Sequence, residues 1–489
     1  MILALLLACP PDAPTTDKPA DTDTPPVTTA AEPLVFSIGA HEERVTELGG
    51  TLVVNVAEAV TVTCTADADP AEVFTTAFPA DDQPPFLVTL AFYGLAPETP
   101  YTCVAATASG ASVTVPVTTG RWVDAPEVIQ EGDTTAIEGA YTVFNVGDLC
   151  RGDGTNTVWV ADPEGRLRWR WGVPEDGVPD IDVSWLGDRF LIGGGAGIYG
   201  LGNGAIREVD LAGTILYERM NPATGVEYNH HVERLDDGTD LAVVWQLNEG
   251  TRGTFVGFGI ERTDPVTGEV LFDWNSQTAL DRGQLPSGAP NEDSYHANAV
   301  RWAPDDPGGP AYWISLAQLG NVVRLDAETG DVTTRIGVGG DWTLVDPSDT
   351  VVGDGWFDFQ HAITVDFAAD PPLLRMHDNG LAYGRSRGLD LALDLDDRVA
   401  TVAWQYTEDD WQEYPGGDHD VLPGGNRLVT QGHCDCCQTT DRESTITEVD
   451  PDTLDALWRL RLPSQDAWLY RSERLDGCAI FGNGKYCAE

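Results

Sequence analysis

The sequence predicts an all-β protein in which a small β-sandwich precedes a six-bladed β-propeller. Three observations predict this fold. A turn-and-strand unit occurs six times after residue 125, and residues 33–120 alternate apolar and polar side chains between closely spaced turns. The chain also contains 52 Gly, 32 Pro and 15 Trp, which is typical of turns and aromatic-rich strands rather than helix bundles. At 489 residues it is too long for one ordinary domain.

The charge balance excludes some functions. Lys and Arg number 28 and Asp and Glu 79, which gives a net charge of −51. A nucleic-acid binder needs a basic surface, and so does a protein that adheres electrostatically to anionic lipid. Apolar residues make up 42% of the chain, so it can bury a sizeable core and is not globally disordered.

The N-terminus predicts export. Residues 1–9 are a short apolar run that ends in Leu6-Leu7-Ala8-Cys9 and resembles a bacterial lipobox, a signal that is cut before a lipidated Cys. The run is shorter than the about 20 residues of a membrane span. Residues 10–32 are rich in Pro, Thr and Asp and predict a disordered tether. We therefore expect a bacterial protein anchored by lipid at Cys9, in the periplasm or at the cell surface; the alternative is an ordinary apolar terminus with a chance Cys.

The cysteines fit an oxidising compartment. Nine are present, and without Cys9 the number is even, as disulfide bonding requires. We expect Cys64 to pair with Cys103 across the sandwich, and Cys478 with Cys487 around a C-terminal loop. The others are Cys150, Cys434, Cys436 and Cys437. The cluster at 433–437 is also a possible zinc site, but thiolate zinc sites are unusual in exported proteins.

The first domain, residues 33–120, has a recognisable corner. The segment from Leu90 to Cys103 resembles the E–F corner of a fibronectin type III or immunoglobulin-like sandwich. Tyr101 stands two residues before Cys103, where such sandwiches place a tyrosine corner. We expect this domain to be a spacer without chemistry.

The second domain, residues 125–489, contains the repeat. An acidic residue, a short turn and an aromatic or apolar strand recur, and the spacings between copies are 48, 54, 62, 68 and 56 residues. This period with strand chemistry is typical of propeller blades. Chance hairpins in another β fold are the alternative. The copies begin at Asp162, Asp210, Asp264, Asp326, Asp394 and Asp450.

Four histidines stand in register with these repeats. Each opens a short strand 30 to 33 residues before the next repeat's Asp. In a propeller, equal register means equal radial position, so the four imidazoles are expected to converge on the central channel. The preceding repeat has Asp180 or Asp182 at this place. The four are His231, His296, His361 and His419.

A histidine cluster without a carboxylate pair suits either anion chemistry or metal ligation. The segment from His377 to Arg387 favours an anion, because it carries Arg385 and Arg387. A guanidinium matches a tetrahedral oxyanion and repels a metal cation. The alternative role for either Arg is surface solvation or pairing with one of the many acids.

Five segments together resemble the bacterial arylsulfate sulfotransferases, over about residues 125–489, and a β-sandwich before a six-bladed propeller is also part of that family's architecture. The segments are Asp293-Ser-Tyr-His296-Ala-Asn298, Phe359-Gln360-His361, Asp378-Asn379-Gly380 with Ser386-Arg387, His419 to Asn426, and Tyr470-Arg471-Ser-Glu473-Arg474.

The resemblance implies transfer of a sulfuryl group from a phenolic sulfate to another phenol, through a transiently sulfated His and without a nucleotide, metal or cofactor. It implies His419 as nucleophile, with His433 as a rival, and His296 and His361 as sulfate-binding and acid/base residues. It implies Arg387, or else Arg385, as the anion-binding guanidinium. We expect His231, Asn298 and Asn379 to contact the substrate; His231 has no clear family counterpart.

Two other functions remain open at this point. Four axial His also resemble the iron-dependent carotenoid-cleaving oxygenases, although these have seven blades and six repeats are present here. A non-catalytic surface propeller that binds glycans or proteins is the other alternative.

Overall fold

The computed structural model describes most of the chain after the N-terminal tether. The predictions for Cys9, Cys150, Cys487 and the 433–437 cluster concern residues outside the described part. The described residues are 32–81, 83–147, 155–176, 181–194, 204–220, 222–223, 225, 227–289, 292–346, 356–409, 411–413, 416–432, 443–463 and 467–486.

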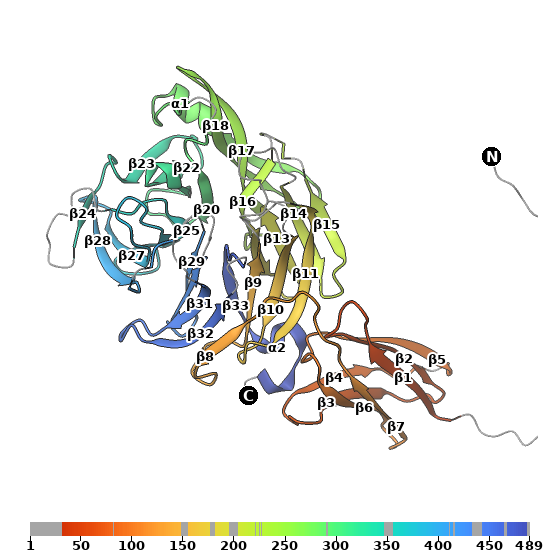
Figure 1. Cartoon of the computed structure of the whole chain (residues 1–489). Coiled ribbons are helices and arrows are strands. Elements are labelled where there is room, and N and C mark those ends of the chain that lie inside the picture. The colour runs from red at the N-terminus through yellow and green to blue at the C-terminus, as the bar shows by residue number, and fades with distance from the viewer. Residues whose placement is uncertain are drawn as a thin grey trace, which may run out of the picture.

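The chain is all-β, as predicted, and its first seven strands form two sheets with a common core (Figure 1). Along β6 the buried side chains alternate with the exposed ones, as the sequence pattern predicts. One sheet contains β1 (Leu34–Ala40), β2 (Leu48–Val54) and β5 (Phe86–Phe92). The other contains β4 (Val73–Phe78), β3 (Val60–Ala66), β6 (Pro100–Thr107) and β7 (Ser112–Thr118).

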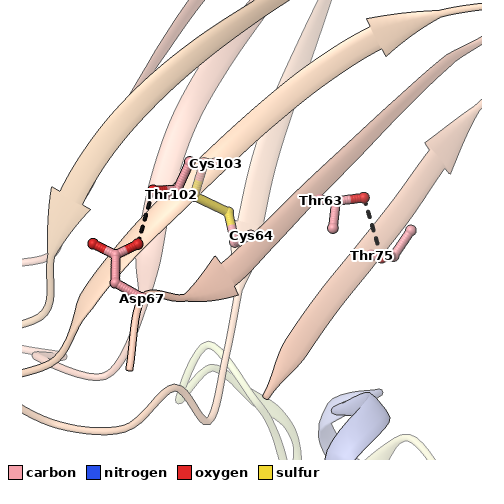
Figure 2. The surroundings of a disulfide bond; sticks show 6 residues. All are labelled: Thr63, Cys64, Asp67, Thr75, Thr102 and Cys103. Carbon is pink, nitrogen blue, oxygen red and sulfur yellow. Dashed lines mark hydrogen bonds between the residues drawn. A yellow bond between two sulfur atoms is a disulfide. The ribbon is translucent and has the colours of Figure 1, made fainter. Parts of the chain in front are cut away.

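The predicted disulfide between Cys64 and Cys103 is present (Figure 2). It joins directly opposed residues of the neighbouring strands β3 and β6, so it lies within one sheet. Our expectation that it crosses from one sheet of the sandwich to the other is therefore wrong. Tyr101 lies close by, and its hydroxyl accepts a hydrogen bond of 2.9 Å from the backbone N–H of Ala96, the contact that defines a tyrosine corner. Cys478 is also disulfide-bonded, to a partner outside the described residues.

In the described part of the chain, six further antiparallel sheets of four or five strands follow, and one of them gains a parallel edge strand. Three of them are β11-β10-β9-β33, β12-β13-β14-β15 and β16-β17-β18-β19. Their strands are β9 (Tyr141–Val146), β10 (Thr155–Ala161), β11 (Leu167–Asp176), β12 (Ile181–Trp185), β13 (Arg189–Gly194), β14 (Ala205–Asp210), β15 (Ile215–Arg219), β16 (Glu227–Arg234), β17 (Asp240–Gly250), β18 (Gly253–Thr263), β19 (Val270–Asn275) and β33 (Ser472–Leu475).

The other three sheets are β20-β21-β22-β23, β24-β28-β27-β26-β25 and β29-β30-β31-β32-β8. Their strands are β8 (Ile129–Gly132), β20 (Ala297–Ala303), β21 (Ala311–Leu316), β22 (Asn321–Asp326), β23 (Val332–Gly337), β24 (Thr343–Val345), β25 (His361–Asp366), β26 (Leu373–Asp378), β27 (Arg387–Asp394), β28 (Val399–Tyr406), β29 (Asp418–Val421), β30 (Arg427–Gln431), β31 (Ser444–Val449) and β32 (Ala456–Leu462).

The two ends of this larger part close on each other. The C-terminal strand β33 pairs with β9 of the first sheet, and β8 pairs with β32 of the last. The strands β12, β16, β20, β25 and β29 contact one another in succession, and β33 contacts both β12 and β30. The six sheets therefore surround a common axis on which one strand of each sheet lies.

Helices are few and short. They are α1 (Ser276–Asp281), α2 (Gly477–Phe481), and the 3-10 turns η1 (Ala317–Leu319) and η2 (Gly484–Tyr486). Within the described residues, no helix is long and apolar enough to cross a bilayer.

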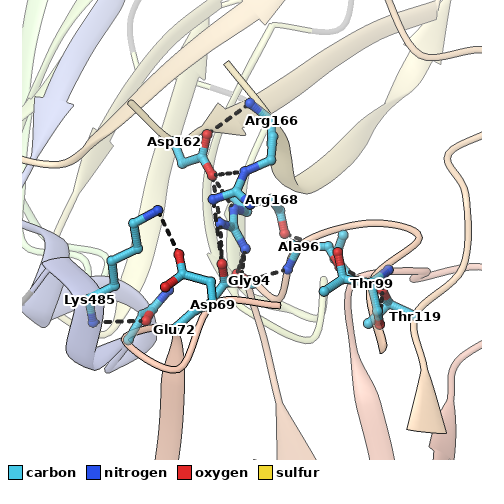
Figure 3. A network of polar contacts seen from close by, with 12 residues as sticks. Asp69, Glu72, Gly94, Ala96, Thr99, Thr119, Asp162, Arg166, Arg168 and Lys485 are labelled. Atoms are coloured by element: carbon cyan, nitrogen blue, oxygen red, sulfur yellow. Dashed lines mark hydrogen bonds and ion pairs between the residues drawn. The ribbon is translucent and has the colours of Figure 1, made fainter. Parts of the chain in front are cut away.

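Ion pairs join the N-terminal sheets to the larger part (Figure 3). Arg168 in β11 is fully buried and donates to Glu72 of the sandwich-like part at 2.6 Å and to Asp162 at 2.6 Å. Lys485 near the C-terminus pairs with Asp69 at 3.1 Å. The charges of Glu72, Arg168 and Asp162 lie where water does not reach, whereas Lys485 and Asp69 are partly exposed.

Candidate active site

Three of the axial strands are irregular where their histidines stand. In β16, the four-residue step from Tyr228 to Val232 lies opposite a two-residue step in β17, and β20 and β25 carry similar register shifts near their first residues. Such bulges re-aim side chains and are frequent at active sites. Of the eight non-glycine residues with positive φ in the described part, four lie here: His230 (57°), His296 (48°), Phe359 (56°) and Ala362 (49°).

These irregular segments bring three imidazoles and one phenol ring together. The ring centroids of His230 and His296 are 4.8 Å apart, and those of His296 and His361 are 6.2 Å apart. The Tyr470 ring lies 5.8 Å from His230 and 6.0 Å from His361. We call His230, His296, His361 and Tyr470 the axial cluster.

His296 is held by a carboxylate. Asp293 Oδ2 lies 2.6 Å from His296 Nδ1, and Asp293 Oδ1 accepts the His296 backbone N–H at 2.9 Å. The imidazole also stacks on Phe359 at 5.2 Å. With Nδ1–H donating to Asp293, the neutral ring carries its lone pair on Nε2.

His361 is held by neutral groups instead. Its Nδ1 lies 2.7 Å from Asn379 Oδ1 and 3.1 Å from the Phe359 carbonyl oxygen. Asn379 Nδ2 in turn donates to the Gly416 carbonyl at 2.8 Å, so the amide orientation is fixed from both sides. His361 therefore also presents Nε2 as a base.

Burial keeps the imidazole rings of His230 and His361 neutral. His230 and His361 are almost fully buried, and desolvation holds the pKa of each well below the usual value of 6.5. The nearby His296 and the Arg471 guanidinium lower both pKa values further. At neutral pH His230 and His361 are therefore unprotonated, and such imidazoles can act as nucleophiles or bases.

A charged network borders the axial cluster. Arg471 Nη1 lies 2.8 Å from Asp182 Oδ2 and 2.8 Å from His231 Nδ1, and Arg471 Nη2 donates to the Asn298 carbonyl at 2.9 Å. Asp182 Oδ2 is also 2.8 Å from His231 Nδ1. The Arg471 guanidinium lies 5.2 Å over the Tyr470 ring, so this network adjoins the cluster directly.

The same network lines a cavity of about 440 Å³. Carboxyl groups crowd it, and burial together with Asp420 raises the pKa of Asp418 to about 8. The charged residues that line it are Asp182, His231, Glu233, Arg234, Arg301, Asp418, Asp420, Arg471, Glu473 and Arg474.

His419 lies away from the axial cluster. In β29 its neighbours Asp418 and Asp420 line the cavity, so His419 points to the opposite face of the strand. There its ring is fully buried, stacks on Trp404 at 5.0 Å, and lies 3.6 Å from Asp390. Burial lowers its pKa to about 3.

The two predicted guanidinium groups have other partners. Arg387 donates from Nε to Asp378 at 2.8 Å, from Nη1 to Gln405 at 3.0 Å and from Nη2 to the Trp356 carbonyl at 2.7 Å. Arg385 donates from Nε to Thr407 at 3.0 Å. Both guanidinium groups therefore bind partners outside the axial cluster.

Of the predicted site residues, the structure brings His296, His361 and Asn379 together. Asn298 is nearby, since its amide Nδ2 donates to the Gln360 carbonyl at 2.8 Å, and His231 belongs to the network with Arg471. His230 was missed, because counting along the repeats selects His231 and cannot detect the bulge in β16. The adjacent pair His230-His231 was the available signal.

Comparisons with known proteins identify the family. The model of the arylsulfotransferase (ASST) family matches residues 190–450, more than half of the chain, and no curated protein matches. Three similar solved structures have low TM-scores. TolB from Acinetobacter baumannii has a TM-score of 0.40 and 13% identity over 78% of this chain and 80% of its own.

The second, a putative 6-phosphogluconolactonase from Bacteroides fragilis, has a TM-score of 0.34 and 10% identity over 86% of this chain and 96% of its own. The third, the Dos1 propeller, has a TM-score of 0.30 and 15% identity over 61% and 64%. The family match covers His230, His231, His296, His361 and His419. The chain belongs to the arylsulfotransferase family.

Proposed function

We propose that this protein is an exported arylsulfotransferase that moves a sulfuryl group from a phenolic sulfate to another phenol through a sulfated histidine. Family membership supports sulfotransferase activity on phenolic substrates in general. The observation that carries the mechanism is the axial cluster, in which three imidazoles lie with ring centroids 4.8 and 6.2 Å apart.

His296 is the proposed nucleophile. Its Nε2 lone pair attacks the sulfur of the donor, the S–N bond forms, and the S–O bond to the donor phenol breaks, so the electron pair leaves on the phenolate. The imidazole ring becomes positively charged in this step. Asp293, at 2.6 Å from Nδ1, stabilises that charge, whereas His361 has only an amide and a carbonyl at its Nδ1.

His361 is the proposed base of the second step. The acceptor phenol attacks sulfur while its proton passes to His361 Nε2, the S–N bond breaks, and neutral His296 is restored. The protonated His361, whose pKa lies well below 6.5, then releases this proton, and the leaving phenolate of the donor takes one up. One proton is taken up and one released per turnover, so no other reactant is needed.

The nucleophile therefore moves, in this proposal, from His419 to His296. The buried ring of His419 contacts Trp404 and Asp390, on the face of β29 opposite the cavity that Asp418 and Asp420 line. His433 lies outside the described residues.

The architecture fits this function. We infer that the six sheets are the blades of a propeller over residues 125–489, closed by β8 and β33, and that residues 33–120 are a sandwich domain. Export to an oxidising compartment is supported by the Cys64–Cys103 disulfide. Anchoring at a lipidated Cys9 through the tether of residues 10–32 completes the proposal.

The test is sulfuryl transfer from 4-nitrophenyl sulfate to phenol by the fragment from residue 33. We expect nitrophenol release that depends on the acceptor, loss of turnover in His296→Ala, and near-wild-type turnover in His419→Ala. Rapid quenching followed by mass spectrometry should find the sulfuryl group on the peptide that contains His296.

Three results contradict the proposal. Sulfation at His419, or inactivity of a folded His419→Ala alone, restores the first nucleophile assignment. No release from any of a panel of aryl sulfates favours a binding protein. Stoichiometric iron, with activity lost on chelation, favours an oxygenase-like function.

A further inference from the structure

Arg471 retains a hydrogen-bond donor that no group in the described structure satisfies. Its side chain is only 4% exposed, yet Nε has no partner among the described residues. Each nitrogen of Arg387, by contrast, donates to a protein oxygen. A buried donor left without an acceptor destabilises the fold, and more so when it is charged. Such a donor is expected where a ligand supplies the missing acceptor.

Arg471 also acts electrostatically on the cluster. Its guanidinium lies 5.2 Å over the ring of the neighbouring Tyr470, and that ring contacts both His230 and His361. Because an arginine stays charged at any relevant pH, it gives the neutral imidazoles a permanent cationic neighbour. A strongly acidic chain needs such a local positive charge to hold an anion.

We propose that Arg471 binds the sulfuryl oxygens of the donor and that Asp182 and His231 are positioning residues for it. This assignment rests on the proposed function, and it replaces Arg387 and Arg385 as the anion-binding guanidinium. An arginine suits a sulfate ester because its planar N–H groups match two oxygens of a tetrahedral anion.

Asp182 positions Arg471 by a short ion pair. Its Oδ2 lies 2.8 Å from Arg471 Nη1 and 2.8 Å from His231 Nδ1. Arg471 and His231 hold the pKa of this carboxyl far below its usual value, so Asp182 stays charged. The Asn298 carbonyl fixes Nη2. These contacts use Nη1 and Nη2 and leave Nε for the ligand.

The first experiment compares Arg471→Lys and Asp182→Asn with the wild type in the assay with 4-nitrophenyl sulfate. We expect Arg471→Lys to raise the KM for the donor about 10- to 100-fold, the range of one lost charge-assisted hydrogen bond. The KM for the acceptor should stay unchanged. Asp182→Asn should also raise the donor KM, but by a smaller factor, and leave the acceptor KM unchanged. A purely structural role for Asp182 would not affect the donor KM alone.

Arg324→Lys is the matched control. Arg324 is also buried, but its Nε, Nη1 and Nη2 all donate to protein oxygens, those of Asp306, Thr333 and Gly309. We expect Arg324→Lys to lower the melting temperature and leave the donor KM unchanged. A larger rise of the donor KM in Arg387→Lys than in Arg471→Lys overturns the proposal.

A direct titration separates this proposal from the proposed function. Inorganic sulfate is titrated into the full-length wild type and Arg471→Lys by calorimetry, with no turnover required. Weaker sulfate binding in the variant supports Arg471 even if no aryl sulfate is turned over, and equal binding overturns it. If Arg471→Lys does not fold, the same sulfate titration is made with Asp182→Asn, and weaker or equal binding is interpreted in the same way.

Discussion

At the scale of single residues, the partner of Nδ1 divides the roles of the histidines. His296 faces a carboxylate and His361 faces an amide oxygen, although both rings lie in one cluster. A carboxylate favours a ring that becomes cationic, which suits a nucleophile that forms an N–S bond. The amide oxygen of Asn379 fixes the tautomer of His361 but raises its pKa less than a carboxylate would. This suits a base that must be neutral before it accepts a proton.

The pH dependence tests this division. The pKa of His361 is well below 6.5, so the ring remains unprotonated when pH falls from 8 through 6.5. We therefore expect the acceptor half-reaction, followed by stopped flow, to keep its rate across that interval. Asn379→Asp places a carboxylate at Nδ1, raises the pKa of His361, and should move the acid limb to higher pH. A wild-type decline centred near 6.5 would contradict the assignment of a buried neutral base.

At the scale of elements, the alternation of side chains explains which predictions succeeded. The strands, the turn repeats and the axial position of His296 and His361 follow from periodicity, because alternation and turn chemistry are written in the sequence. A shift of one residue moves a side chain to the other face. In β16 the bulge places His230 in the cluster, and in β29 regular alternation turns His419 away. The sequence indicates Arg471 only as part of the last of the five family-like segments, because no periodicity predicts a contact with Asp182, 289 residues away along the chain.

The bulge in β25 requires an unusual backbone conformation at Ala362, and this can be tested by substitution. Its φ of 49° is strained for a β-branched side chain and easy for glycine. We expect Ala362→Val to lower the free energy of unfolding by about 1–3 kcal/mol and to reduce turnover, because His361 is the preceding residue. Ala362→Gly should retain turnover. Urea unfolding and the transfer assay measure both, and a fully active Ala362→Val would show that the bulge does not orient His361.

At the scale of the whole molecule, the first two sheets are fixed to the larger part. From the sequence we expected residues 33–120 to be a spacer. In the structure the guanidinium group of Arg168, buried between Glu72 and Asp162, connects these residues to the larger part (Figure 3). Glu72 also accepts from the Tyr101 hydroxyl at 2.5 Å, so the tyrosine corner and the interface share one carboxylate. The catalytic part and these sheets should therefore unfold together.

Glu72→Gln tests this joint stability. The pKa of Glu72 is lowered to about 2, because the hydrogen bonds and charge of Arg168 outweigh its desolvation. A carboxyl group whose pKa is lower in the folded than in the unfolded state contributes its full stabilisation at pH values above the unfolded pKa near 4.5. This stabilisation is lost as the pH falls toward 2. Removing one member of a buried pair costs about 3–5 kcal/mol, so at pH 7 the variant should unfold at clearly lower urea.

The difference in free energy of unfolding between the wild type and Glu72→Gln should depend on pH, and this dependence is a sharper test than the size of the difference at pH 7. As pH falls from 4.5 to 2, wild-type Glu72 becomes protonated and the two free energies of unfolding should converge. Glu42→Gln, at an exposed position, should follow the wild type throughout. If the difference between wild type and Glu72→Gln stays constant from pH 7 to 2, the Glu72 charge does not hold the two parts together. A separate first unfolding transition in the wild type would likewise show that the N-terminal sheets move independently.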